Sequence, residues 1–570
     1  MALSWRVFRL ASFLCLEGLL FLTDNELSRA THVQLLVAVW LSQITMRGIW
    51  LVFLWPHFFS PLRHLPQPGD GHWILGQGRR LAGNLPATPV KEWMEGIENN
   101  GLIRYLSFFN KERVIVCSPE ALKEVLVSRN YDFAKPMTTR AMLSPTLGHG
   151  LLLAEGNEHK IQRKNLVPAF HVRHVKALYP LFWKKAGEVV QAMTAVVAAA
   201  AAADAADADD AADAADAADA AAAEDTTGPG PKTAATLDAF SWASRCTLDI
   251  IGLAGMGVDF GAIQDDNNTL AVTYRHISAP SAQARLMMTL SMILPAWSLK
   301  YLPLKRNRDL GAAARTIRRE SLAMIQKRRR LMQLDKEHKE LDIISVALRS
   351  GLFKDEELVD QVMTFLAAGH DTTASALTWC VYQLSRHPDA QQKLREEVRQ
   401  CLEPAGSGLD ISSADIDNMP YLNAVCSEVL RTYSPVPLTL RVAACDTVIQ
   451  GQVIPKGTGI MLAPWGTNVD IKLWGPDAAE FKPERWLSSA GGGAESNYAF
   501  MTFLHGPRGC IGSNFARAEL ACLLAAWVGR FSFQLADEEL MDERKLLFKP
   551  SVIAKPAIGL DTRVQIVEGW

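Results

Sequence analysis

The chain has 570 residues, of which 49% are hydrophobic and 21% are charged, and its formal net charge is −2. This length is enough to bury a large core, and the near-neutral charge gives no reason to expect a nucleic-acid partner. The nine cysteines are an odd number without a Cys-x-x-Cys pair. They argue against a disulfide framework and a paired-cysteine zinc site, and they favour a reducing compartment.

Residues 1–59 are predicted to form a membrane anchor region. Apolar stretches occur at 8–22 and 33–55, and the second is long enough to cross a bilayer about 30 Å thick, although Arg47 interrupts it. Tryptophan and phenylalanine crowd its end, as they do at membrane interfaces, and a buried pair of core helices would not need them there. We expect a transmembrane helix at about 33–55 and a catalytic domain at 60–570; whether 8–22 also inserts stays open.

The catalytic region is predicted to be mainly α-helical with a minor strand component. Residues 113–117 are expected to form a strand, followed by a helix with Ser118 as its N-cap. The segment 159–170 is predicted to be helical up to Pro168. Later in the chain, 447–462 alternates apolar residues with Gly and Pro turns, as in a β-hairpin.

A low-complexity insertion interrupts this pattern at 198–232, with an Ala-Ala-Asp period and then Gly/Pro breakers. A period of three drifts around a 3.6-residue helix and makes no apolar face, so we expect a solvated, partly helical insertion without chemistry. Without the nine acidic residues of 198–225, the formal charge would be +7. The basic stretch 305–330 is usually a solvated face, but it also suits an acidic partner or anionic lipid.

The long segment 355–388 is predicted to be one helix, about 45 Å long for its roughly 30 residues. Its middle, 367–376, has only small or polar side chains, a shallow face against which a planar cofactor and a small molecule can rest. A close crossing of two helices explains the alanines but not Asp371. Asp371 and Thr372 are therefore a candidate proton relay, whereas His370 alone is expected to be a packed or surface histidine.

A single cysteine, Cys510, lies in "FLHGPRGCIG" (503–512), directly before a predicted helix at 512–527. Unpaired N–H groups and the helix dipole at such a position lower the pKa of a thiol and can donate hydrogen bonds to a bound sulfur. A nucleophilic cysteine would need a base, for which His505 is available. A buried, inert cysteine is a further alternative that the local sequence leaves open.

The neighbours of this cysteine suit a flat, anionic group. Gly506 and Gly512 carry no side chain and let the backbone approach something close and planar. Arg508 is a permanent cation suited to a carboxylate, and Phe503 can shield the sulfur from water. Upstream, Glu428 and an arginine three residues later share one helix face; an exposed pair of this kind is common and contributes little by itself.

These motifs together resemble the cytochrome P450 superfamily of haem-thiolate monooxygenases. The segment 503–512 fits the signature F-x-x-G-x-R-x-C-x-G at every fixed position, and "AGHDTT" (368–373) fits the oxygen-activating helix motif. An E-x-x-R pair and "PERW" (483–486) follow the order of the family. The resemblance covers roughly residues 60–570. It implies the cytochrome P450 fold, mainly α with minor β, behind an N-terminal membrane anchor.

The resemblance also implies roles for individual residues. Cys510 would be the axial thiolate ligand of the iron of haem b (iron protoporphyrin IX), favouring O–O cleavage. Asp371 and Thr372 correspond to the acid–alcohol pair that delivers protons to dioxygen. His159 stands where many members have tryptophan. The implied cofactor-binding residues are Cys510, Arg508, Phe503, Gly506, Gly512, His159, Arg163 and Arg441, and the implied structural triad that supports the cysteine loop is Glu428, Arg431 and Arg485.

The implied activity is hydroxylation or epoxidation of an apolar small molecule with O2. No flavin-binding region accompanies the matched motifs, so electrons are expected from a separate NADPH-cytochrome P450 reductase. The expected location is the endoplasmic reticulum membrane, in contact with lipid, with the catalytic domain in the cytosol. "AGHDTTASALTW" and "PERW" look like microsomal enzymes of filamentous fungi, many of which serve secondary metabolite biosynthesis.

Two other functions remain compatible with Cys510. A haem-thiolate isomerase or dehydratase uses no external electrons, but such relatives often lose the helix acid or alcohol, and both are present here. A non-catalytic haem-binding protein needs only Cys510 and predicts no turnover with a reductase.

Overall fold

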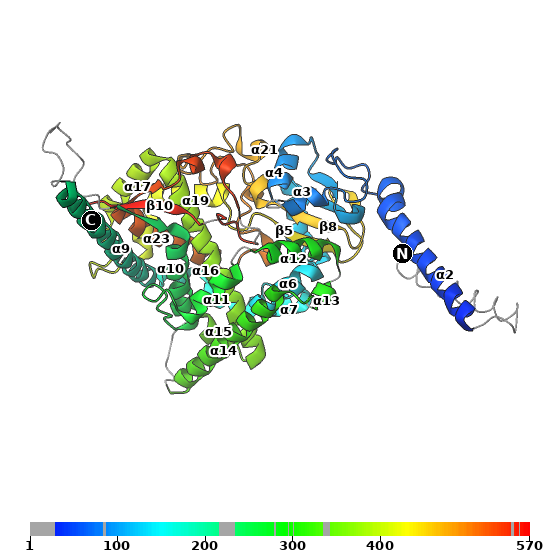
Figure 1. Cartoon of the computed structure of the whole chain (residues 1–570), viewed down its shortest axis with the longest axis horizontal. Helices are drawn as coiled ribbons and strands as arrows, with labels where there is room; N and C mark the ends of the chain where they lie inside the picture. The colour runs from blue at the N-terminus through cyan, green and yellow to red at the C-terminus, as the bar shows by residue number, and fades with distance from the viewer. Residues whose placement is uncertain are drawn as a thin grey trace.

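The computed structural model describes residues 29–83, 87–215, 234–278, 281–294, 296–299, 301–334, 342–548, 552–557 and 559–570. Figure 1 shows a broad body of packed helices with small sheets, from which one N-terminal helix projects. The predicted fold class, mainly α with minor β, is confirmed.

The projecting helix is α2 (Arg29–Ile49), and it continues as the π-helix η1 (Trp50–Phe59). Its segment Val37–Phe59 is long and apolar enough to cross a membrane, and very little of it is buried. This finding is compatible with a membrane anchor, and the segment ends four residues later than the predicted 33–55. The other apolar stretch, 8–22, lies outside the described residues.

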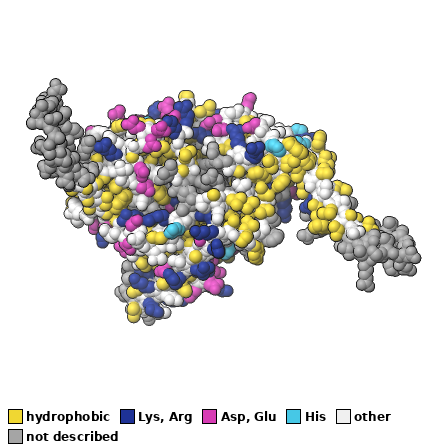
Figure 2. Space-filling model, viewed as in Figure 1, with side chains coloured by type: hydrophobic (Ala, Val, Ile, Leu, Met, Phe, Trp, Pro, Cys, Tyr) yellow, Lys and Arg dark blue, Asp and Glu magenta, His cyan; other side chains and the backbone are white. Residues whose placement is uncertain are grey.

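The end of the projecting helix, η1, contacts the first two strands, β1 (Leu102–Leu106) and β2 (Glu112–Val116). Arg104 Nη2 donates to Pro56 O at 2.5 Å, and Trp55 Nε1 donates to Glu112 Oε2 at 3.0 Å. Arg104 and Glu112 themselves form a buried ion pair at 2.8 Å. Figure 2 shows hydrophobic side chains gathered where the helix meets the body. Phe58 of η1 is an exposed hydrophobic residue.

Deletion of residues 1–49 should release the protein from membranes, because it removes most of the apolar span and leaves the contacts of η1 with β1 and β2. Full-length protein is expected in the pellet after carbonate extraction, and the shortened protein mostly in the supernatant with its helical content per residue retained. Full-length protein found wholly in the supernatant would contradict the anchor.

The described strands form a five-stranded sheet, a three-stranded sheet and a separate two-stranded hairpin. The larger sheet has the order β1-β2-β8-β5-β3, in which β2 and β8 are parallel and the other pairs antiparallel. The predicted hairpin forms over β6 and β7, whereas the end of the predicted segment becomes β8 and pairs with β2 instead. The remaining strands are β3 (Phe133–Ala134), β4 (Ala234–Asp238), β5 (Thr439–Ala443), β6 (Thr447–Ile449), β7 (Gln452–Ile454), β8 (Gly459–Leu462), β9 (Phe531–Leu535) and β10 (Asp561–Ile566).

The centre of the body is α16 (Asp355–Arg386), the long helix that the sequence predicts. It packs against α10, α14 and α23, with α10 the most extensively. A Cβ on Gly369 would lie 2.8 Å from Cγ1 of Ile251 on α10, so glycine is needed for this close crossing. The small residues of the window 367–376 therefore serve helix packing in part. The packed helices are α7 (Gly156–Leu166), α9 (Tyr179–Ala215), α10 (Ala239–Met256), α14 (Lys305–Leu334), α19 (Pro420–Thr432) and α23 (Ser513–Arg530).

The remaining helices pack around these elements (Figure 1). The expected helix after β2 begins as predicted, because Ser118 Oγ accepts from Ala121 N. The alanine–aspartate tract continues α9 as far as Ala215, and the rest of 198–232 lies outside the described residues. These helices are α3 (Gly78–Gly83), α4 (Ala87–Gly96), α5 (Pro119–Lys123), α6 (Met137–Leu147), α8 (Val172–Lys176), α11 (Thr269–Ser278), α12 (Ala282–Ile293), α13 (Ala296–Leu299), α15 (Ile343–Ser350), α17 (Pro388–Cys401), α18 (Ser413–Asp417), α20 (Pro464–Thr467), α21 (Ile471–Trp474) and α22 (Arg485–Ser488).

Candidate active site

The loop that carries Cys510 has a tightly determined shape. It contains the 3-10 turn η7 (Gly506–Arg508), and the backbone N–H of Cys510 donates to Phe503 O at 2.8 Å. Gly506 has φ +72°, and a Cβ there would lie 2.2 Å from Leu126 O, so only glycine fits. Gly512 differs, because a Cβ there would make an ordinary contact of 3.6 Å with Phe170.

Cys510 lies three residues before the start of α23, and its side chain is exposed. Although the sulfur is accessible, the protein atoms packed around it desolvate the thiolate and raise the pKa of the thiol, and the Gly512 N–H and the Arg163 charge oppose this effect only in part. The N–H of Gly512 at the start of the helix lowers this pKa, as predicted, but desolvation outweighs that effect in the protein by itself. A metal bound to the sulfur would remove the proton outright.

Arg508 points from the same loop towards β3. Its Nη1 donates to Phe133 O at 2.8 Å, and its Nη2 pairs with Glu155. The Nε atom is buried and has no hydrogen-bond partner among the described residues. Glu155 also accepts from Lys135 N at 2.9 Å and lies 4.0 Å from Lys135 Nζ. One carboxylate therefore faces two cations at this point.

Further cationic and polar side chains gather around this pair. Arg163 Nη1 donates to the carbonyl of Gly509 in the cysteine loop at 2.7 Å. Burial, reinforced by Arg508, lowers the pKa of Arg441 to about 10. Burial, reinforced by Lys135, lowers the pKa of His159 to about 4, and His159 Nδ1 lies 3.2 Å from the hydroxyl of Tyr131.

This cluster has more buried positive charge than its single carboxylate balances. Burial, with Arg441 as the next largest cause, lowers the pKa of Lys135 to about 7. An anionic group placed here would relieve the repulsion and offer an acceptor to the buried Nε of Arg508. The residues present therefore fit the two carboxylates of a haem beside an accessible sulfur. Lys135, Glu155 and Tyr131 were missed by the sequence analysis because they lie outside the recognised motifs.

The middle of α16 is more accessible than the rest of that helix. Ala367, Ala368, Asp371 and Thr372 are half-buried, whereas the residues on either side are mostly buried. Thr372 Oγ1 donates to Ala368 O at 2.7 Å, the helix-internal bond expected of a threonine. Asp371 Oδ1 accepts from Lys555 Nζ at 2.8 Å, a partner from the C-terminal segment that no sequence motif indicates.

Glu428, Arg431 and Arg485 come together in a fully buried network. The carboxylate of Glu428 accepts from Arg431 Nε at 2.8 Å and Nη2 at 2.7 Å, and from Arg485 Nε at 2.9 Å. Two donors outside the predicted triad complete the set, Trp486 Nε1 and the backbone N–H of Lys482, each at 2.9 Å. The guanidinium of Arg431 also donates to the backbone carbonyls of Asn468, Ala478 and Glu480. The Asn468 side chain in turn accepts from Met501 N and donates to Thr502 Oγ1, just before the cysteine loop.

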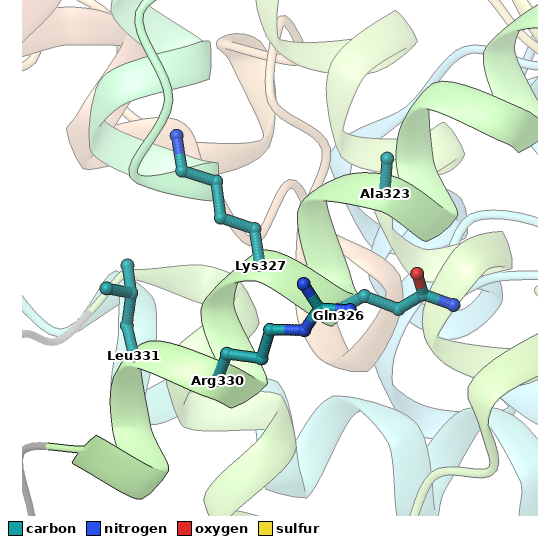
Figure 3. Close-up of a pocket in the computed structure, with 5 residues that line it drawn as sticks. All are labelled: Ala323, Gln326, Lys327, Arg330 and Leu331. Carbon is teal, nitrogen blue, oxygen red and sulfur yellow. The ribbon is translucent and has the colours of Figure 1, made fainter.

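A surface pocket along α14 lies in the basic stretch, away from these motifs in the sequence. Figure 3 shows the five side chains of this one helix that line it. Two cations of α14 are engaged within the chain, Arg318 with Asp360 and Arg329 with Asp355, both on α16. The basic stretch therefore partly serves to hold α14 on α16. The pocket is lined by Ala323, Gln326, Lys327, Arg330 and Leu331.

Comparison with known proteins identifies the family. The family described as Cytochrome P450 matches residues 66–212 and 216–556. The chain is 44% identical to "Cytochrome P450 monooxygenase sphH" of Aspergillus fumigatus, over 95% of this chain and 94% of that protein. Identity is 41% to "Cytochrome P450 monooxygenase ALT8" of Alternaria alternata, over 92% of this chain and 93% of that protein. Identity is 40% to "Cytochrome P450 monooxygenase FUM15" of Gibberella moniliformis, over 91% of this chain and 90% of that protein. The chain therefore belongs to the cytochrome P450 family.

Proposed function

We propose that this chain is a membrane-anchored monooxygenase that uses haem b and O2 to hydroxylate or epoxidise an apolar small molecule in fungal secondary metabolism. The observation that carries the proposal is the accessible sulfur of Cys510 beside a surplus of buried cations. The similar relatives named as cytochrome P450 monooxygenases support the reaction class. The haem, when bound, supplies the reductive activation of dioxygen.

The residues of the cofactor site have distinct roles in this proposal. Cys510 binds the iron through its sulfur, and the loop shape set by Gly506 holds the sulfur in place. The haem carboxylates are bound by a set that combines predicted and newly found side chains. Phe503 shields the sulfur, and Gly512 leaves room for the ring. The carboxylate-binding set is Lys135, His159, Arg163, Arg441 and Arg508.

Proton delivery is assigned to the half-buried window of α16. Asp371 holds the proton, and the hydroxyl of Thr372 orients the water or the oxygen that receives it. The presence of both side chains favours oxygen chemistry over the isomerase and dehydratase alternative. The glutamate–arginine network around Glu428 acts by holding the segment before the cysteine loop, through the contact of Arg431 with Asn468.

Electrons come from a separate NADPH-cytochrome P450 reductase in this proposal. The partner approaches the cysteine loop, where Gly506 and Pro507 are exposed, because electron transfer needs a short path to the iron. The basic stretch on α14 is less suited to this role, since two of its arginines already pair with α16. The anchor places the enzyme at the endoplasmic reticulum membrane, in contact with lipid, with the catalytic domain in the cytosol.

Replacement of Thr372 by alanine tests the oxygen chemistry. With reductase and substrate, NADPH consumption should continue while product falls and hydrogen peroxide rises, because the hydroxyl that directs the proton is gone. A loss of about tenfold in product per NADPH corresponds to roughly 1.4 kcal/mol between the productive and leaking paths. Product and peroxide are assayed in parallel.

A matched control is Thr378→Ala on the same helix. Thr378 Oγ1 donates to Ala374 O at 2.8 Å, the same helix-internal bond as in Thr372, but its side chain is fully buried. Thr378→Ala should keep the wild-type ratio of product to NADPH. Equal ratios for Thr372→Ala and wild type would rule out the proposed role of the hydroxyl.

A further inference from the structure

The last turns of the candidate membrane span run alongside the folded body. Asn110 Nδ2, in the turn between β1 and β2, donates to Val52 O at 2.9 Å. The ring of Trp73 stacks on that of Phe53, with centroids 5.7 Å apart. Val52 and Phe53 come seven and six residues before the end of the span at Phe59. The β1–β2 turn and the loop of Trp73 therefore lie beside the span and not beyond its end.

This placement sets the depth of the body once the span crosses a bilayer. At 1.5 Å per residue, seven helical residues cover up to about 10 Å along the helix axis. The headgroup layer on each side of the hydrocarbon core is only about 5–7 Å thick. A span inserted as far as Phe59 therefore brings the β1–β2 turn and Trp73 to the boundary between headgroups and acyl chains.

The side chains at this depth are apolar and exposed. Trp73 is 67% exposed and Phe109, in the β1–β2 turn, is 46% exposed. Phe58 and Phe59 at the end of η1 are exposed as well, and we call these four residues the aromatic collar. Hydrophobic side chains also gather on the face shown in Figure 2, where the helix joins the body. Contiguous exposed apolar surface marks an interaction site, and tryptophan is enriched at membrane interfaces.

Phe109 has a backbone conformation that is unfavourable for a bulky residue. Its φ is +56° and its ψ is +37°, in the left-handed region that favours glycine and asparagine. Asn110, the next residue, has φ +50° and suits this region. The turn thus presents a phenylalanine ring at a position where a small polar residue would relieve strain and be well solvated. An apolar environment around the ring would offset the strain.

The charged groups near the collar suit a phospholipid surface. Arg104 and Glu112, which contact η1, pair with each other and are only 2% and 9% exposed. Arg63 and Lys111 are exposed cations. Arg63 Nη1 donates to Phe58 O at 2.5 Å, and Lys111 ends the β1–β2 turn. Long cationic side chains of this kind can extend from an apolar level to phosphate groups.

We propose that the aromatic collar is a lipid-binding surface of the catalytic body, seated in the bilayer that the span crosses. The hydrogen bonds from Arg104 and Asn110 to the backbone of η1 hold span and body in one orientation, so the same face of the body meets the membrane. Four rings give only a reversible contact, so carbonate, which strips surface-bound proteins, should still release the protein shortened by residues 1–49. The inference rests on the proposed membrane anchor.

Photolabelling of the full-length protein tests the collar without any substitution. The protein is reconstituted in phosphatidylcholine vesicles that contain a phosphatidylcholine with a diazirine near the carboxyl end of one acyl chain, irradiated and digested with trypsin. Cleavage after lysine and arginine separates the segments 48–63, 64–79 and 105–111, which contain the end of the span, Trp73 and Phe109. All three segments should carry lipid adducts.

Two exposed side chains elsewhere on the body are internal controls. Ile471 of α21 and Leu409, which follows α17, are each 61% exposed, and both helices lie away from the projecting helix (Figure 1). Their peptides should carry only background adducts. Adducts on 48–63 with background on 64–79 and 105–111 would overturn the collar and leave the anchor standing. Background on 48–63 as well would overturn the anchor and the collar together.

Substitutions test whether the rings hold the body on the lipid as one surface. Phe109→Asn removes a ring, suits the left-handed backbone, and should make segment 64–79 lose most of its adducts, because the whole face lifts. Trp73→Ser should do the same to segment 105–111, whereas Leu409→Ser should leave both segments labelled as in the wild type. Circular dichroism confirms that each variant is folded. Undiminished labelling of the neighbouring segment in both folded variants would overturn the proposal.

Discussion

Cys510→His should abolish the strongly red-shifted Soret band that reduced, carbon monoxide-treated wild-type protein is expected to show. The band requires a thiolate ligand, and Cys510 is the cysteine that the loop shape presents with an exposed side chain beside the cation cluster. The variant keeps Gly506 and the arginines that would bind the haem carboxylates. Some haem should therefore remain bound, with the spectrum of a different ligand. The effect on oxygen-dependent turnover should be complete loss.

Cys445→Ser is a matched control for this result, because Cys445 is also an exposed free cysteine and lies between β5 and β6. Its spectrum should be that of the wild type. A wild-type spectrum typical of histidine-ligated haem would contradict thiolate ligation, and an unchanged red-shifted band in Cys510→His would assign the ligand to another cysteine.

Glu428→Ala should prevent accumulation of folded holoenzyme. Removing this fully buried carboxylate leaves the guanidinium of Arg431 without its counter-charge and leaves Arg485 with Asp477 alone, at 3.4 Å. Breaking a buried pair in this way costs about 3–5 kcal/mol, a large part of the roughly 5–15 kcal/mol by which a domain is stable. The hydrogen bonds from Trp486 and from the backbone of Lys482 are lost as well. Soluble yield, haem content and the urea midpoint of any folded protein measure the effect.

Glu484→Ala provides the comparison, because Glu484 lies in the same "PERW" segment but forms a half-exposed pair with Lys393 at 2.8 Å. Its loss should cost less than about 1 kcal/mol. Glu428→Gln keeps the shape of the side chain and one acceptor oxygen, so this variant should lose less stability than Glu428→Ala. Equal stability of Glu428→Ala and Glu484→Ala would show that the network does not support the fold.

Local patterns were sufficient for the elements whose causes lie close together in the chain. The long helix α16 follows from its apolar spacing and its end before Pro388, and the structure has it at Asp355–Arg386. The helix after β2 follows from the cap at Ser118. The hairpin prediction at 447–462 was right for β6 and β7 but not for β8, because β8 pairs with the distant strand β2.

Some site residues likewise belong to local motifs, whereas others reach the site only through tertiary packing. Cys510, Thr372 and the pair Glu428 and Arg431 are marked by the resemblance of their short motifs, in order, to those of a known family; the spacing of the pair alone would not mark it. The partner of Asp371 is not marked, because Lys555 is 184 residues away and reaches α16 only through the packing of the C-terminal segment. His370 shows the limit most clearly: the sequence leaves it as a packed or surface histidine, and the structure makes it a buried neighbour of that ion pair.

The sequence by itself determined the family, the likeness of its motifs to those of haem-thiolate enzymes, and the mainly helical fold, because these depend on short spacings and on apolar periodicity. Only the tertiary structure decided which charges meet. The packing of distant segments brings Glu155 next to Arg508 and Lys135, and this packing is a property of the folded chain. It also makes desolvation outweigh the helix terminus at the Cys510 thiol. Short-range patterns report which side chains are available, and long-range packing determines the electrostatic environment in which they act.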